Sequence, residues 1–141
     1  MKKLAVLLIL IITGLSACKK KPDTKFEAFS PEAFAYSLDN GWEVDATVMV
    51  RGYEMKEEKS QNNISLAYTV DLITPDQQTK KGMFADTLDE SSSEPYSDLK
   101  LESQIELDST YVPGKYKVVF NIKDLLSGDE LNTAREFEIT K

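Results

Sequence analysis

The stretch Tyr116-Lys-Val-Val-Phe-Asn-Ile122 (YKVVFNI, residues 116–122) decides the fold class of this protein. Its apolar side chains recur at every second position, at Tyr116, Val118, Phe120 and Ile122. This period of two is typical of a β-strand that buries one face. Pro113-Gly114 predicts a turn before the strand, and residues 124–130 (DLLSGDE) predict a hairpin after it. A last strand should then present Thr133, Arg135, Phe137 and Ile139 on one side.

Three earlier segments alternate in the same way. Residues 42–50 place on one side Trp42, Val44, Ala46, Val48 and Val50. Residues 64–72 do the same with Ile64, Leu66, Tyr68, Val70 and Leu72, and residues 99–107 with Leu99, Leu101, Ser103, Ile105 and Leu107. Gly52 suggests a bulge after the first of these segments. The polar residues 56–63 (KEEKSQNN) predict a loop before the second.

The remaining segments are less regular. Phe34, Tyr36 and Leu38 alternate, and Asn40-Gly41 after them predicts a hairpin, since both residues tolerate a positive φ. A short helix is the rival interpretation, with Ser30 as its N-cap and Pro31 at its first position. Between residues 76 and 98 the pattern predicts a short strand over 82–88 and an exposed loop over 89–97.

About seven short strands without a long amphipathic helix predict an all-β fold, a single antiparallel β-sandwich. The run LDSTYVPGKYKVVFNIKD (residues 107–124) resembles the last strands of immunoglobulin-like and fibronectin type III-like domains. In those families a tyrosine at the start of the penultimate strand often turns its hydroxyl back to the backbone, and Tyr116 matches that position. The resemblance implies architecture only, because the paired core cysteines of antibody domains are missing and a fold does not specify a function.

Composition excludes several kinds of function. The chain has 141 residues, no histidine and a single cysteine, so it lacks the residues for a disulfide, a His-dependent triad or a Cys/His metal site. Residues 26–141 contain 11 Lys or Arg and 23 Asp or Glu. A domain this acidic repels phosphate backbones, so nucleic acid is not an expected partner. No catalytic signature, cofactor motif or metal-ligand set points to an enzyme.

The first 18 residues resemble the leader of a bacterial lipoprotein. A basic start (Met1-Lys2-Lys3) precedes an apolar run, and Leu15, Ser16, Ala17 and Cys18 match the lipobox. The resemblance implies that a peptidase cuts before Cys18 after diacylglycerol has been joined to its sulfur. A transmembrane helix is the rival interpretation, but about 12 mostly apolar residues fall short of the roughly 20 that span a bilayer. We expect residues 1–17 to be a signal peptide.

The mature chain is expected to be held at a membrane. Residues 18–30 predict a flexible tether after the lipidated cysteine, and residues 31–141 the β-sandwich domain. In many two-membrane bacteria an aspartate after the lipidated cysteine retains a lipoprotein at the inner membrane. Lys19 stands at that position here, which implies the outer membrane, and the basic residues around it favour the periplasmic face. In an organism with one membrane the anchor would lie in the plasma membrane.

Three sets of residues are candidates for a binding site. The acidic residues Asp86, Asp89, Glu90, Glu94 and Asp98 either form a solvated loop or bind calcium, which prefers oxygen ligands. Trp42 either packs in the core or stacks on a sugar. Tyr53, Phe84 and Tyr96 interrupt the alternation, and if exposed together they would mark a partner surface.

These observations favour a non-enzymatic accessory lipoprotein that contacts another protein of the cell envelope. The alternative is a module that binds a glycan or calcium. In either case Cys18 is the point of lipid attachment, and Trp42 and Tyr116 are structural residues of the domain.

Overall fold

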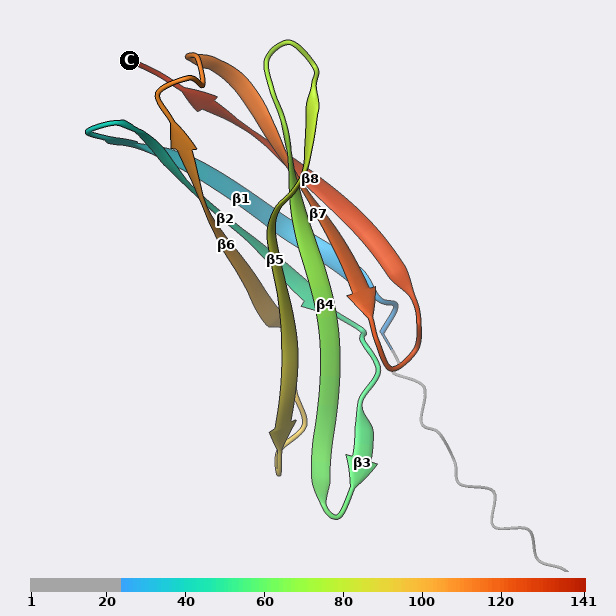
Figure 1. Cartoon of the computed structure of the whole chain (residues 1–141). Coiled ribbons are helices and arrows are strands. Elements are labelled where there is room, and N and C mark those ends of the chain that lie inside the picture. Colours follow the sequence, from blue (N-terminus) through green and yellow to red (C-terminus); the bar gives the residue numbers. More distant parts are fainter. Residues whose placement is uncertain (1–23) are drawn as a thin grey trace, which may run out of the picture.

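The computed structural model describes residues 24–141 and consists of antiparallel β-strands. Figure 1 shows two sheets that pack face to face. The strands are β1 (Glu27–Leu38), β2 (Gly41–Arg51), β3 (Lys56–Glu58), β4 (Gln61–Ile73), β5 (Thr79–Ser92), β6 (Leu99–Asp108), β7 (Gly114–Asp124) and β8 (Glu130–Ile139). The predicted all-β sandwich is confirmed, with eight strands in the described part of the chain where about seven were expected.

The strand order is that of an immunoglobulin-like sandwich. One sheet has the order β1-β2-β6, and the other has the order β3-β4-β7-β8 with β5 also paired to β4. Strands β1, β2 and β6 occupy the places of the A, B and E strands of an immunoglobulin domain, and β4, β7 and β8 those of C, F and G. Strand β5 lies beside β4, where variable-type domains have their C′ strand.

The core lies between the inner faces of the two sheets. Along β2, β4, β6 and β7 every second residue is buried, as the alternation predicts. Among the fully buried side chains are Val44, Val48, Leu66, Leu72, Leu101, Val118 and Phe120. Each contributes roughly 1.5–3 kcal/mol of hydrophobic free energy when it leaves water. This layer therefore supplies most of the stability of the domain.

Strand β1 departs from the expected pattern because it contains a β-bulge. Phe29 pairs with Met49, but the next pair is Glu32 with Thr47, so β1 has one extra residue. Ser30 adopts a left-handed φ of 49° at this point. Because side chains alternate between faces, one extra residue moves every later side chain of β1 to the opposite face. The rival interpretation of a short helix at Ser30 and Pro31 is wrong, and the two residues form the bulge within β1 instead.

The limits of β1 also revise the expected domain boundary. The strand begins at Glu27, four residues before the expected start of the domain at residue 31. Residues 27–29, which were assigned to the tether, pair with the end of β2, and Ser30 belongs to the bulge that follows. There Arg51 forms an ion pair with Glu27 and lies over the Phe29 ring, 4.8 Å from its centroid. The folded domain therefore begins earlier than the sequence pattern suggests.

The β1–β2 hairpin forms where it was predicted, although its loop is placed differently. Leu38 pairs with Gly41, which leaves Asp39 and Asn40 as the two loop residues. Gly41 begins β2 with a φ of 145°, and a Cβ at this position would collide with the Leu107 carbonyl oxygen of β6. Glycine is required here because the neighbouring backbone approaches so closely.

Two other segments contain more strand than expected. The predicted loop 56–63 is a hairpin between β3 and β4, in which Lys59 and Ser60 both have a positive φ. The predicted short strand over 82–88 is the 14-residue β5, which extends to Ser92. Its side chains are mostly exposed because it is the edge strand beside β4. An edge strand forms its backbone hydrogen bonds to one neighbour and does not need a regular apolar face. The alternation of apolar residues in β5 is therefore weak.

Candidate functional site on the outer face of the three-stranded sheet

A row of large apolar side chains lies exposed on β1. Phe34, Tyr36 and Leu38 are 54%, 51% and 45% exposed. They occupy alternate positions after the bulge, so they share the outer face of the β1-β2-β6 sheet, while Ala33 points into the core. Clustered apolar side chains on a surface often mark a site of interaction. We call Phe34, Tyr36 and Leu38 the aromatic stripe.

Carboxylates cover the rest of this outer face. The strand register places Tyr36 opposite Glu43 and Phe34 opposite Asp45. On β6 the corresponding positions hold Glu102, Glu106 and Asp108. Lys100, which is also on this face, is already paired with Glu102. Hydrogen bonds from the side chain and backbone of Thr110 lower the pKa of Asp108, so this carboxylate stays charged. The face is therefore strongly negative beside the aromatic stripe.

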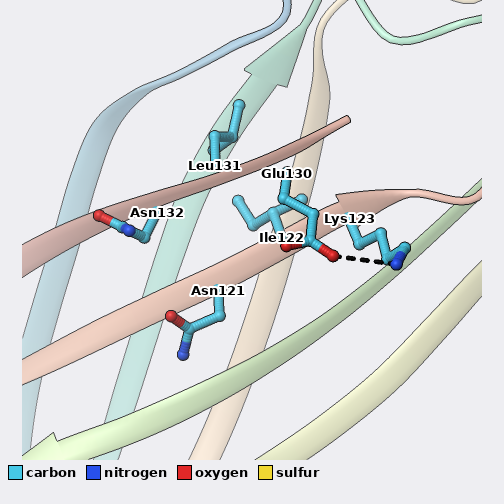
Figure 2. Close-up of a pocket in the computed structure, with 6 residues that line it drawn as sticks. All are labelled: Asn121, Ile122, Lys123, Glu130, Leu131 and Asn132. Carbon is cyan, nitrogen blue, oxygen red and sulfur yellow. Dashed lines mark ion pairs between the residues drawn. The ribbon is translucent and has the colours of Figure 1, made fainter. Parts of the chain in front are cut away.

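The outer face of the other sheet has a different composition. One feature of this face is an open hollow of about 270 Å³ between β7 and β8, lined by Asn121, Ile122, Lys123, Glu130, Leu131 and Asn132 (Figure 2). The Lys123 Nζ atom lies 2.9 Å from the Glu130 Oε1 atom. The Asn121 side chain donates a hydrogen bond of 3.0 Å to Asp71. Lys123, Glu130 and Asn121 are therefore already engaged in polar contacts within the protein.

The expected site residues fall in different parts of the molecule. Leu15, Ser16, Ala17 and Cys18 lie outside the described residues, so the lipobox stays a prediction. Trp42 lies on the inner side of β2, partly buried against the core. Tyr116 is buried, and its hydroxyl donates a hydrogen bond of 2.6 Å to the Val112 carbonyl oxygen. Its ring stacks on Phe137 with the ring centroids 5.6 Å apart.

The Tyr116 hydrogen bond is the one that the immunoglobulin-like resemblance implies. It joins the turn before β7 to the strand itself, four residues along the chain. A buried tyrosine hydroxyl needs a partner, and here the partner is a backbone oxygen that the turn would otherwise leave to water. Tyr116 therefore stabilises the connection from β6 to β7.

The acidic residues of the suggested calcium site do not form a compact cluster. Asp86 and Glu90 lie on one side of β5 and Asp89 on the other, where it accepts a hydrogen bond from Ser65. Within residues 24–141 no group of three or more acidic side chains is arranged to hold a metal ion. Charges along an edge strand discourage pairing with the edge of another molecule. This role accounts for the acidic residues that lie on β5.

The aromatic residues that interrupt the alternation do not form an exposed surface. Tyr53 does not meet the condition of exposure, because its side chain is 3% exposed and its hydroxyl donates to the Ser97 carbonyl oxygen. Burial, together with the nearby carboxylate of Asp98, raises the pKa of Tyr53 to about 12. Phe84 packs against Tyr68 with the ring centroids 5.9 Å apart. Tyr53 and Phe84 thus join the core to β5 and the segment that follows it.

Sequence reasoning missed the structural role of Asp124. This side chain is 1% exposed, yet its Oδ2 atom accepts a hydrogen bond of 2.6 Å from the Glu54 backbone N–H. Its Oδ1 atom accepts hydrogen bonds from the N–H groups of Leu126 and Ser127. A buried carboxylate is stable when backbone donors satisfy it in this way. The local signal was an aspartate at a strand end followed by Ser127-Gly128-Asp129, which is typical of an Asx-type turn.

Comparisons with known proteins give little information on function. Neither a protein-family model nor a curated protein matches the chain. The chain is similar to a protein from Archaeoglobus fulgidus of known crystal structure, with 16% identity over 82% of this chain and 98% of that chain and a TM-score of 0.39. A likeness at that score supports no argument about function.

Within residues 24–141 no helix is long and apolar enough to cross a membrane.

Proposed function

We propose that this protein is a lipid-anchored envelope module that binds another protein and catalyses no reaction. The observation that supports this function best is the aromatic stripe. This strand face carries three large apolar side chains that are about half exposed. Keeping them in water is unfavourable, because burial of each one would lower the free energy. A partner that covers Phe34, Tyr36 and Leu38 would remove them from water, and this burial would stabilise the complex.

The sequence supports the anchor and the location. The lipobox resemblance at residues 15–18 implies lipidation of Cys18 and a mature chain that starts there. Lys19 after the cysteine favours the outer membrane, and the basic residues around it favour the periplasmic side. The lipid would hold the domain near the membrane by a short tether, and the stripe would face partners within the envelope. Replacing Cys18 by Ser should leave an unprocessed precursor, which mass spectrometry of the purified protein would show.

Site-specific photo-crosslinking in living cells tests the binding function. A photoreactive phenylalanine analogue in place of Tyr36 should crosslink to a defined envelope protein. The same analogue in place of Asn132, which is exposed on the outer face of the other sheet, is the matched control and should give no such product. Equal crosslinking from both positions, or none from position 36, would contradict the proposal.

A glycan is a second candidate ligand for the same stripe. Phe34 and Tyr36 offer exposed rings for stacking on a sugar, and Glu43 and Asp45 lie opposite them as hydrogen-bond acceptors. A ligand that binds only the native state must raise the melting temperature. Thermal melts with a panel of envelope glycans would favour this candidate if the temperature rises, and would remove it if every glycan leaves it unchanged.

A further inference from the structure

The tripeptide Glu-Ala-Phe occurs twice in β1, at residues 27–29 and at residues 32–34. The bulge at Ser30 and Pro31 separates the two copies. Its extra residue places the glutamate and phenylalanine of both copies on the same face of the sheet. Glu27 and Phe29 lie on the outer face before the bulge, and Glu32 and Phe34 lie on the same outer face after it. In each copy the carboxylate and the ring are two residues apart, which is about 7 Å along a strand.

The first copy already holds an arginine. Arg51 of β2 pairs with Glu27, and its Nε atom donates a hydrogen bond of 2.5 Å to the Glu27 Oε1 atom. The guanidinium carbon of Arg51 lies 4.8 Å from the centroid of the Phe29 ring. One arginine thus makes an ion pair and a cation–π contact at once, because its planar group suits both partners.

The second copy has no such cation in the described chain. The residue opposite Glu32 is Thr47, where the first copy has Arg51, and the residue opposite Phe34 is Asp45. The Phe34 ring is 54% exposed and Glu32 is exposed as well. The site therefore has the same carboxylate and ring as the first copy, with a further carboxylate beside them.

We infer that the second Glu-Ala-Phe copy binds an arginine side chain of the protein partner, so that the aromatic stripe recognises a segment rich in arginine. This inference rests on the proposed binding function and names the chemistry of its partner. Carboxylates on β2 and β6 add attraction for any basic segment that lies across the sheet. The apolar residues between the arginines of that segment would cover Tyr36 and Leu38.

Charge disfavours the other occupants of this face. A second copy of the chain would bring the same carboxylates against those of Glu43, Asp45 and Glu106, and like charges repel. Anionic lipid head groups and nucleic-acid phosphates would be repelled for the same reason. A basic protein segment is the one macromolecular partner whose charge complements the face.

The substitution Thr47→Arg provides a direct test. It places an arginine opposite Glu32, in the position that Arg51 has opposite Glu27, so the chain should fill its own site. The full chain, purified in detergent, is titrated with a fluorescent peptide in which arginine alternates with leucine. Thr47→Arg should weaken binding of this peptide about tenfold, since an exposed ion pair and a cation–π contact together contribute on the order of 1–2 kcal/mol. Thr47→Met, which resembles the neighbouring Met49 and adds no charge, should bind as the unchanged chain does.

Two further binding measurements complete the test. Glu32→Gln should also weaken binding, and a peptide with citrulline in place of arginine should bind at least tenfold more weakly. Equal binding of the arginine and citrulline peptides would overturn the inference, and so would crosslinks from position 36 that join two copies of this chain. If peptide binding fails while crosslinking of position 36 to an envelope protein persists in cells, only the arginine inference fails. Loss of both results would remove the proposed function as well.

Discussion

Strands β7 and β1 have the same kind of apolar alternation and use it in opposite ways. In β7 the alternating residues Tyr116, Val118 and Phe120 point into the core and are almost fully buried. In β1 the alternating residues Phe34, Tyr36 and Leu38 point to solvent. The two strands differ in their neighbours, because β7 lies between β4 and β8 while β1 pairs only with β2. Alternation therefore predicts a strand, and the surrounding sheet decides which face of it is buried.

The β-bulge of β1 is the local cause of the difference. Without the extra residue at Ser30 and Pro31, the parity of β1 before the bulge would continue and Phe34 would point inward. The inner positions are occupied instead by Ala33 and Ala35, which face Ala46 and Val44 of β2. Bulges commonly redirect side chains at functional positions. Keeping three large apolar groups in water costs stability, and this cost is the ground for the binding role proposed above.

Truncating one phenylalanine in each strand should give the largest contrast. Phe120→Ala removes a fully buried ring and leaves a cavity, which should lower the free energy of unfolding by about 3–5 kcal/mol. Phe34→Ala should change it by less than about 0.5 kcal/mol, because the ring is exposed. Urea denaturation of both variants measures the difference. Similar losses in the two variants would mean that β1 is not oriented as described.

Neighbouring positions within β1 offer a sharper test of its orientation. Ala33→Asn places an amide in the core without a partner and should cost about 2 kcal/mol. Phe34→Asn, one residue further along, should be nearly neutral for stability. The apolar pattern alone predicts the reverse order, so thermal melts of this pair decide between the two orientations.

The third test removes the hydroxyl group of one tyrosine in β7 and of one in β1 and compares the loss of stability. Tyr116→Phe deletes the hydrogen bond to the Val112 carbonyl oxygen and should cost about 1–2 kcal/mol. Tyr36→Phe is the matched control on the exposed strand face and should leave stability unchanged. If Tyr116→Phe is also neutral, the hydroxyl does not stabilise the turn before β7.

Alkaline pH should lower the stability of the fold by a smaller amount, because the buried tyrosines resist losing their protons. Because the pKa of Tyr53 is raised to about 12, the unfolded chain loses this proton at a lower pH than the native protein does. The stabilisation is complete below about pH 10 and is lost as the pH rises towards about 12. Burial also raises the pKa of Tyr68 and that of Tyr116. In Tyr53→Phe, urea midpoints measured across this range should fall less steeply, and an unchanged slope would assign the effect to other groups.

Much of the fold was predictable because most strands follow one rule. The segments within β2, β4, β6 and β7 bury one face and expose the other, so their residues alternate in polarity. Strand β5 was predicted too short because its exposed edge imposes no such pattern on residues 79–92. The short strand β3 was missed because its three residues are all charged and exposed.

The candidate site was much less predictable. The sequence shows that Phe34, Tyr36 and Leu38 alternate, but not that an extra residue turns them outward. It also shows many carboxylates, but not that Glu43, Asp45 and Glu106 share one face with the stripe. The first relation depends on the bulge in the β1–β2 pairing, and the second depends also on the register between β2 and β6, which are far apart in the chain.

The sequence alone determined the fold class, the acidic character of the domain and the lipobox resemblance at Cys18, because composition and short-range periodicity encode these properties. The tertiary structure alone decided the outward stripe on β1, the burial of Tyr53 and the role of Asp124. The stripe depends on the bulge in the β1–β2 pairing, and the other two depend on contacts across large separations in sequence, such as that between Glu54 and Asp124. A pattern within one segment cannot specify which distant backbone will lie beside it, since strand register and packing of the two sheets set those contacts.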